Sequence, residues 1–366
     1  MPLSAAVAPQ FTRLDPSFPF FNRASDFRGC YFFYSVSASH YNVTQMAKTK
    51  IEWTANINPD GTVSQGFTFN PWRGCSKVSP ACKNCYAMEL VNRFGGDFLG
   101  KRVVASESMW KQPLKWNREA AEKGVRYRVF CASLSDVFED YKGWMLNAKG
   151  DSLWIVKDCG TWLWANATEH EALSQQKGVR LASVDDVRAR VFRLIDATPN
   201  LDWLLLTKRP ENILKMWPKV GFPDAGVLGT LGRRLRLENV WLGTTVENQE
   251  QADKRIPELL KCRDLSPVLF LSCEPLLGRV DLRPALWLED QYFKFREQMQ
   301  RGIGWVISGG ESGKDFRPMQ TNWVQSMPEH CKSASVPFFC KQGSGPKSGQ
   351  QYDLPDYLFG VKEFPS

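Results

Sequence analysis

The chain has 366 residues, of which 43% are hydrophobic and 23% charged, and its formal net charge is +8 at pH 7. This length can hold one large domain or two smaller ones, and the positive charge suits a polyanionic partner such as nucleic acid. No apolar run approaches the roughly 20 residues of a membrane-spanning helix, and the first residues lack the basic start and apolar core of a secretory signal. We therefore expect a cytoplasmic protein with no membrane partner.

Three regions are expected along the chain. Residues 1–47 form an aromatic-rich stretch without periodicity, which we interpret as a poorly ordered N-terminal extension. Patterned sequence begins at Lys48 and predicts a domain over 48–345. Residues 346–366 then form a C-terminal tail.

Short apolar runs recur through the patterned region, and each ends in small or polar residues. Uninterrupted runs of this kind are typical of strands buried on both faces, as in a parallel sheet. From Leu206 onward they recur at intervals of about 30 residues, the length of a strand-loop-helix-loop unit. The predicted strands lie within 125–136, 201–212, 239–248, 267–278, 303–313 and 336–343.

Helical patterns lie between these runs. In the first, Ser183 can cap the start and Pro199 ends the segment. Segments 248–262 and 284–300 indicate further covering helices. The alternation predicts an α/β fold with parallel strands and helices outside, either closed as a barrel or open. The apolar face of the first helix consists of Val184, Val187, Val191, Leu194 and Ile195.

One interval breaks this rhythm. The residues from about 141 to 183 are rich in Gly and Trp and have no strong helical face. We interpret them as a small β-rich insert over one end of the sheet.

Histidine is too scarce for many catalytic sites. His40, His170 and His330 are the three in the chain, and none follows a predicted strand, so Ser-His or Cys-His triads and His-rich zinc sites have little support. The ten cysteines of a cytoplasmic protein are not expected to form disulfides. A tight cysteine cluster therefore indicates metal or redox chemistry.

Such a cluster lies in the loop 70–86, where Cys75, Cys82 and Cys85 occur close together. Structural zinc needs four protein ligands, and the loop offers one Cys-x2-Cys pair and a third thiol. A four-iron cluster with three cysteine ligands leaves one iron open for a substrate or cofactor. We favour the 4Fe-4S cluster and keep zinc as an alternative. The zinc site would take its fourth ligand from Cys131, Cys159, Cys273 or Cys340.

Polar residues follow every predicted strand. In parallel α/β barrels the active site lies at the carboxyl ends of the strands, so these residues predict a ligand-binding mouth. They are Ser133, Ser135, Asp136, Thr207, Lys208, Arg209, Thr244, Thr245, Glu247, Asn248, Ser272, Glu274, Ser308, Gly309, Gly310, Glu311, Ser312, Lys341 and Gln342.

A family resemblance rests on a string of motifs between residues 50 and 342, outside the insert. They include "FNPWRGCSKVSPACKNCYA", "SLSDVFED", "NLDWLLLTKRPEN", "LFLSCEPLLG", "WVISGGESG" and "VPFFCKQ". Together they resemble a phage-associated family of unknown function whose members are similar to radical S-adenosylmethionine enzymes. The resemblance implies a partial (β/α) barrel of the radical-SAM type. It also implies that Cys75, Cys82 and Cys85 each ligate one iron, and that the fourth iron binds S-adenosylmethionine.

The motifs depart from the usual radical-SAM pattern at two points. The usual loop is Cys-x3-Cys-x2-Cys with an aromatic residue before the last cysteine, whereas here the first gap is six residues and Tyr86 follows Cys85. The segment Gly309-Gly310-Glu311 resembles the element that holds the methionine amino group, but that element normally follows the second strand. Phosphate or substrate binding is an equal alternative for this segment.

The remaining site predictions concern strand ends. Ser135 and Asp136 are nominated for the second-strand position, and Thr207, Thr245 and Glu247 are further cofactor-binding candidates. The predicted catalytic residues are Glu274 and Lys208.

The leading hypothesis is a radical enzyme that acts on an unknown substrate, with a nucleic-acid base or nucleotide as a candidate, and that needs an electron donor. Trp72, Tyr86 and Trp110 near the cysteine loop could stack on bases. The alternative is a zinc-stabilised nucleic-acid-binding or scaffold protein on a non-catalytic barrel.

Overall fold

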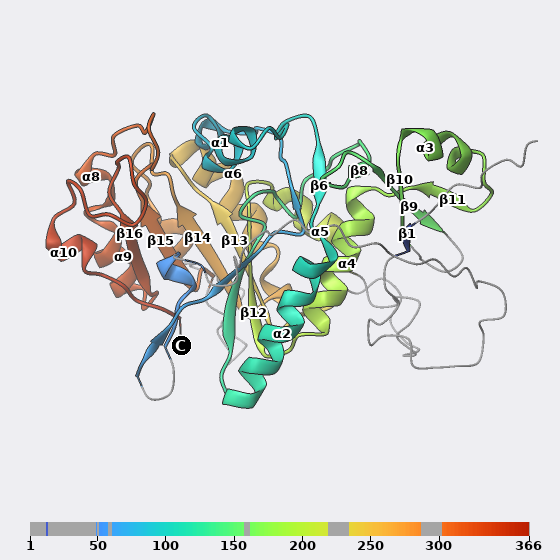
Figure 1. The fold of residues 1–366 in the computed structure, drawn as a ribbon. Coiled ribbons are helices and arrows are strands. Elements are labelled where there is room, and N and C mark those ends of the chain that lie inside the picture. Colours follow the sequence, from blue (N-terminus) through green and yellow to red (C-terminus); the bar gives the residue numbers. More distant parts are fainter. Residues whose placement is uncertain are drawn as a thin grey trace, which may run out of the picture.

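A computed structural model describes residues 12–13, 49, 51–57, 61–156, 162–218, 234–286 and 302–365. Its main feature is a curled seven-stranded sheet, all parallel, that forms a half-barrel with helices around it, as the α/β prediction requires (Figure 1). The strands cross the sheet in chain order: β4 (Phe67–Phe69), β7 (Tyr127–Cys131), β12 (Leu201–Thr207), β13 (Val240–Thr245), β14 (Val268–Cys273), β15 (Trp305–Gly309) and β16 (Phe338–Gln342).

The edge strand β4 is not among the predicted strands. Its sequence is Phe-Thr-Phe, with both rings buried and Thr68 half-buried, so the run is too short and too mixed to be recognised as a buried strand. It pairs in parallel with β7, with Phe67 beside Val129 and Phe69 beside Cys131. The position of β4 matters because the segment with the three clustered cysteines follows this strand in the chain.

Helices cover the half-barrel. The predicted apolar face of α4 (Val184–Asp196) is buried, and Ser183 caps this helix in a capping box with Asp186, so this prediction is confirmed. The helix expected over 284–300 begins as α7 (Arg283–Leu286), and its residues from 287 lie outside the described ranges. The other α-helices are α1 (Tyr86–Arg93), α2 (Glu107–Lys123), α3 (Ala167–Ser174), α5 (Ile213–Met216), α6 (Gln249–Leu260), α8 (Thr321–Val324), α9 (Met327–Ser333) and α10 (Asp356–Phe359). None of the described helices has both the length and the apolar character for crossing a membrane.

Aromatic side chains fill the inside of the half-barrel. Trp53, on the short 3-10 helix η1 (Glu52–Thr54), packs with its ring centroid 4.8 Å from Phe130 and 6.3 Å from Trp305. These residues form a cluster separate from the larger core beneath the helices. The segment that precedes β4 therefore fills part of the concave face of the sheet.

A second, mainly antiparallel sheet lies beside the half-barrel (Figure 1). The predicted insert supplies four of its strands and α3. Of the predicted extension 1–47, only residues 12–13 lie within the described ranges, where they form β1. The strands of this sheet are β1 (Thr12–Arg13), β5 (Trp72–Arg73), β6 (Arg102–Val104), β8 (Met145–Leu146), β9 (Ser152–Val156), β10 (Trp162–Ala165) and β11 (Val179–Leu181). Strands β9, β10 and β11 are to the right of α4 in Figure 1. A separate hairpin consists of β2 (Asn56–Ile57) and β3 (Val63–Ser64).

Candidate functional site

The three clustered cysteines lie in the loop between β5 and α1, in the segment that follows β4. Cys82 ends the short 3-10 helix η2 (Pro80–Cys82), and Cys85 directly precedes α1, at the positive end of that helix dipole. The carboxyl ends of parallel strands meet at one edge of the sheet. Because this loop follows the carboxyl end of β4, it lies at the same edge as the other strand ends.

Gly74 sets the start of the loop. Its φ angle is +108°, and a Cβ atom at this position would lie 2.1 Å from the carbonyl oxygen of Lys101. The backbone N–H of Gly74 donates to Leu134, and that of Cys75 donates to Phe98, both at 3.0 Å. The position before the first cysteine therefore requires glycine.

A cavity of about 410 Å³ opens at this edge of the half-barrel. Its floor is apolar and includes Trp53, Phe130 and Leu206. Of the predicted metal-binding, cofactor-binding and catalytic residues, Glu247 and Gly309 are not part of its lining. Those that line it are Cys75, Cys82, Cys85, Ser135, Asp136, Thr207, Lys208, Thr245, Glu274, Gly310 and Glu311. Among the other residues predicted for the mouth, Thr244, Asn248, Ser308 and Gln342 are not part of the lining either.

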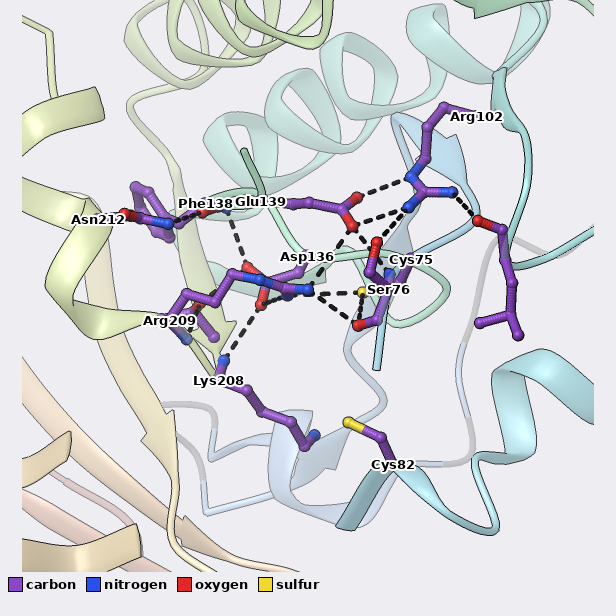
Figure 2. Close-up of polar contacts among 12 residues, drawn as sticks. Cys75, Ser76, Cys82, Arg102, Asp136, Phe138, Glu139, Lys208, Arg209 and Asn212 are labelled. Atoms are coloured by element: carbon purple, nitrogen blue, oxygen red, sulfur yellow. Dashed lines mark hydrogen bonds and ion pairs between the residues drawn. The ribbon is translucent and has the colours of Figure 1, made fainter. Parts of the chain in front are cut away.

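Cys75 lies beside a buried network of charges (Figure 2). Its Sγ atom is 3.6 Å from Nη1 of Arg209, and the same nitrogen donates to Asp136 at 2.8 Å. Glu139 lies 3.6 Å from Arg209 and 2.7 Å from Arg102. Burial of the thiol, and next the negative charges of Asp136 and Glu139, raise the pKa of Cys75 to about 12, although Arg209 acts in the opposite direction. Cys75 is therefore a neutral thiol near pH 7 when no metal is bound.

We expect Cys75 of the metal-free protein to react slowly with iodoacetamide at pH 8. The thiolate is the reacting form, and an ordinary cysteine has a pKa of about 8.5, so a pKa of about 12 lowers the rate roughly a thousandfold. The rate should rise about tenfold per pH unit from pH 8 to pH 10. Timed alkylation followed by peptide mass spectrometry measures it, with the urea-unfolded chain as control. Equal rates for Cys75 in the folded and unfolded chain would contradict this expectation.

Two hydroxyl groups of the cavity lining have no hydrogen-bond partner in the part of the chain that the structure describes. They are Ser135 Oγ and Thr245 Oγ1, and both atoms are buried. A buried polar atom without a partner costs about 1–3 kcal/mol, so such atoms usually indicate a missing ligand or water. These hydroxyls therefore point to a position where a polar ligand could bind.

The two predicted catalytic residues differ in their surroundings. Glu274 forms an ion pair with Lys341, and their side chains are 18% and 14% exposed. The backbone N–H of Lys208 donates to Asp136 at 3.2 Å, and its side chain extends toward Cys82 in Figure 2. Among the described residues the Lys208 ammonium has no ion-pair partner. Lys208 is therefore available to an anionic group in the cavity.

Glu247 and Glu311, both predicted to bind a cofactor, already have arginine partners. Glu247 is fully buried and accepts a hydrogen bond from Arg255 at 2.7 Å. Glu311 pairs with Arg317 and accepts from Nδ2 of Asn84 at 3.0 Å. Burial opposes the charge of Glu311, but the hydrogen bonds from Arg317 and Asn84 outweigh it and lower the pKa of this carboxyl. Both carboxylates are therefore engaged within the protein.

The glycines of the "SGGESG" motif lie at the end of β15. A Cβ atom on Gly310 would lie 2.4 Å from the backbone nitrogen of Ser344, in the segment after β16. Gly310 thus allows two backbone segments to approach each other closely, which explains the glycine without any ligand.

Two of the three aromatic residues considered for base stacking are excluded. Trp72 and Trp110 are 1% and 0% exposed and belong to the core beneath the helices, so that prediction was wrong. Tyr86 is 52% exposed, lines the cavity, and donates through its hydroxyl to the carbonyl of Ser133 at 2.9 Å.

Three charged residues next to the cysteine loop were not predicted from the sequence to belong to the site. Arg102, Glu139 and Arg317 all contact the loop or its partners. Glu139 stands within the motif "SLSDVFED", but a carboxylate among other acidic residues indicates a solvated surface as readily as a buried pair. Of these three residues, Arg102 alone has a signal in its local sequence, because it stands directly before two valines that belong to the same strand.

Comparison with protein-family models matches residues 48–146 and 179–353 to a protein of unknown function, DUF5131. The unmatched interval falls within the predicted insert. No curated protein matches, and no solved structure matches. The family description names neither phages nor radical chemistry. Because the matched segments cover well over half of the sequence, the chain belongs to the DUF5131 family of proteins of unknown function.

Proposed function

We propose that the protein is an iron-sulfur enzyme that uses S-adenosylmethionine to start radical chemistry on a nucleotide or a nucleic-acid base. The observation that carries this proposal is the common position of Cys75, Cys82 and Cys85 on one cavity at the carboxyl end of a parallel half-barrel. Three thiolates leave one iron of a four-iron cluster open to a cofactor.

The donor set supports a cluster better than a single zinc ion. Within the described ranges, no group of three Cys, His, Asp or Glu side chains is arranged to hold one metal ion. The thiolates of a four-iron cluster bind separate irons, so they need not converge on a single point. The cysteines considered as a fourth zinc ligand also give no support. Cys131, Cys273 and Cys340 are buried and are not part of the cavity lining, and Cys159 lies outside the described residues.

Each part of the cavity has a role under this proposal. The three cysteines would hold the cluster, and Ser135 and Thr245 would bind polar groups of S-adenosylmethionine. When bound, the cluster and S-adenosylmethionine supply one-electron chemistry that removes a hydrogen atom from a substrate, with an external protein as electron donor. The apolar floor around Trp53 and Phe130 keeps water away from the reacting atoms.

The nucleotide part of the proposal rests on two side chains and on net charge. Lys208, whose ammonium has no ion-pair partner among the described residues, is available to a phosphate, and the half-exposed Tyr86 offers a ring face for a base. The net charge of +8 favours the approach of a polyanion.

Anaerobic reconstitution with iron and sulfide tests this proposal. We expect about four irons per chain and an absorbance band near roughly 400 nm. After reduction, addition of S-adenosylmethionine should release 5′-deoxyadenosine, detected by mass spectrometry. A colourless protein with one tightly bound zinc, and no 5′-deoxyadenosine, would overturn the proposal and favour the zinc-stabilised binding protein.

A further inference from the structure

We propose that Glu139, Glu247 and Glu311 are positioning residues that hold the cysteine loop, residues 75–85, in its ligand-binding conformation before any metal arrives. This inference deepens the proposed function and rests on it in one respect: it takes the loop cysteines as ligands.

One carboxylate holds the backbone or side chain next to each cysteine. Glu139 accepts the N–H of Ser76, which follows Cys75, at 2.8 Å. The other two contacts come just before a cysteine. Glu247 accepts the N–H of Ala81 at 3.3 Å, and Glu311 accepts from the side chain of Asn84 at 3.0 Å. Cys82 directly follows Ala81, and Cys85 directly follows Asn84.

The three carboxylates come from separate strand ends. Glu139 lies after β7, and Glu247 and Glu311 each lie two residues beyond the last residue of β13 and β15. A loop held at three points by three strands has little freedom to rotate relative to the sheet. Its cysteines therefore keep fixed positions relative to the other residues of the cavity.

Each carboxylate is buried and has an arginine partner. Arg102 donates to Glu139 at 2.7 Å, and Arg255 donates to Glu247 at the same distance. Arg317 donates through Nε to Glu311 at 2.8 Å. Charge-assisted hydrogen bonds of this kind are stronger than neutral ones.

Two of these arginines also bind the loop directly. Arg102 donates to Oγ of Ser76 at 2.9 Å, and Arg317 donates to the carbonyl of Pro80 at 3.1 Å. Each of these ion pairs therefore supplies both a donor and an acceptor to the loop.

The loop has little apolar burial that could hold it otherwise. Between Cys75 and Cys85, Ala81 is the one fully buried residue, and Lys77, Val78 and Lys83 are exposed. Loops of this kind open at low free-energy cost unless polar contacts restrain them. The carboxylate contacts therefore restrain the loop together with two other hydrogen bonds, from Arg209 to the carbonyl of Ser76 at 2.9 Å and from Asn84 to the carbonyl of Asp315 at 2.6 Å.

Hydrogen exchange on the metal-free protein tests the inference. We expect protection in the native chain for the loop amides that donate hydrogen bonds, which are those of Ser76, Ala81, Cys82 and Lys83. Asn84→Ala removes the hydrogen bonds from this side chain to Glu311 and to the carbonyl of Asp315 and leaves the Glu311–Arg317 pair intact, while Glu311→Gln removes the charge and keeps the bond to Asp315. Both should speed exchange in this segment about tenfold, because Asn84→Ala removes a hydrogen bond to a charged group and Glu311→Gln replaces the charged acceptor of that bond by a neutral one. Iron uptake during reconstitution should fall in parallel.

The matched control is Glu107→Gln. Glu107 forms a two-point ion pair with Arg190, at 2.8 and 2.6 Å, and in the part of the chain that the structure describes its side chain makes no hydrogen bond to the cysteine loop. Loss of this pair should leave loop exchange unchanged. A native loop that exchanges at the rate of an unstructured peptide, or unchanged exchange in both Asn84→Ala and Glu311→Gln, would overturn the inference.

The result also separates the two proposals. If both variants speed exchange but the native protein takes up no iron, the positioning role holds and the proposed cofactor fails. If the native protein binds iron and both variants leave exchange and uptake unchanged, the positioning role fails alone.

Discussion

Replacing Cys82 by alanine should abolish cluster binding while leaving the fold intact. Within the described part of the chain, the Sγ atom of Cys82 has one polar neighbour, the hydroxyl of Ser79 at 4.0 Å, and this contact lies outside the charge network beside Cys75. Its loss therefore removes a ligand without breaking a charge network. Because two remaining thiolates hold only two irons, we expect iron content to fall from about four to below about one per chain. Release of 5′-deoxyadenosine should fall more than about hundredfold, to background.

The control for this variant is Cys262→Ala. Cys262 is buried two residues after the end of α6, far along the chain from the loop, and donates weakly to the carbonyl of Glu258. This change should cost some stability but leave iron content and 5′-deoxyadenosine release at native levels. Circular dichroism of both variants separates misfolding from ligand loss. Full iron content in folded Cys82→Ala would contradict the assignment of Cys82 as a ligand.

The sheet was largely predictable because its strands are buried on both faces. Runs such as "LDWLLLT" leave no polar alternation, and this is typical of parallel strands covered by helices. The same rule fails for β4, whose Phe-Thr-Phe sequence carries no such run. β4 is a strand because it pairs with β7, and a pattern of three residues does not indicate pairing with a distant segment.

Much of the cavity was predictable for a related reason. Parallel strands that follow chain order bring their carboxyl ends to one edge of the sheet. That residues such as Ser135, Thr245 and Glu274 meet there can therefore be predicted even when their contacts are not known. The contacts themselves were not predictable. Glu311 could have been free for a ligand, and its engagement by Arg317 and Asn84 depends on how the loop after β4 folds over the sheet.

Replacing Glu139 by alanine should cause the largest loss of stability among the substitutions considered. The side chains of Glu139 and Arg102 are 3% and 0% exposed. Arg102 also donates to the backbone carbonyls of Leu99 and Lys101, and it lies over the ring of Tyr141 at 4.3 Å. Without Glu139, this guanidinium would remain buried with no adjacent countercharge. Breaking a buried pair in this way costs about 3–5 kcal/mol of unfolding free energy, measurable by urea titration.

A double-mutant cycle identifies the cause. Arg102→Met removes the buried charge, so Glu139→Ala combined with Arg102→Met should be more stable than the sum of the two single losses predicts. The neighbouring Asp140→Asn is the control, because Asp140 is a surface carboxylate whose side chain is 41% exposed and pairs with the solvated Lys142. Its unfolding midpoint should stay within error of the native value. Strict additivity in the cycle would mean that the loss in Glu139→Ala comes from packing or from the freed N–H of Ser76. The buried guanidinium would then be stabilised by its carbonyl and aromatic contacts alone.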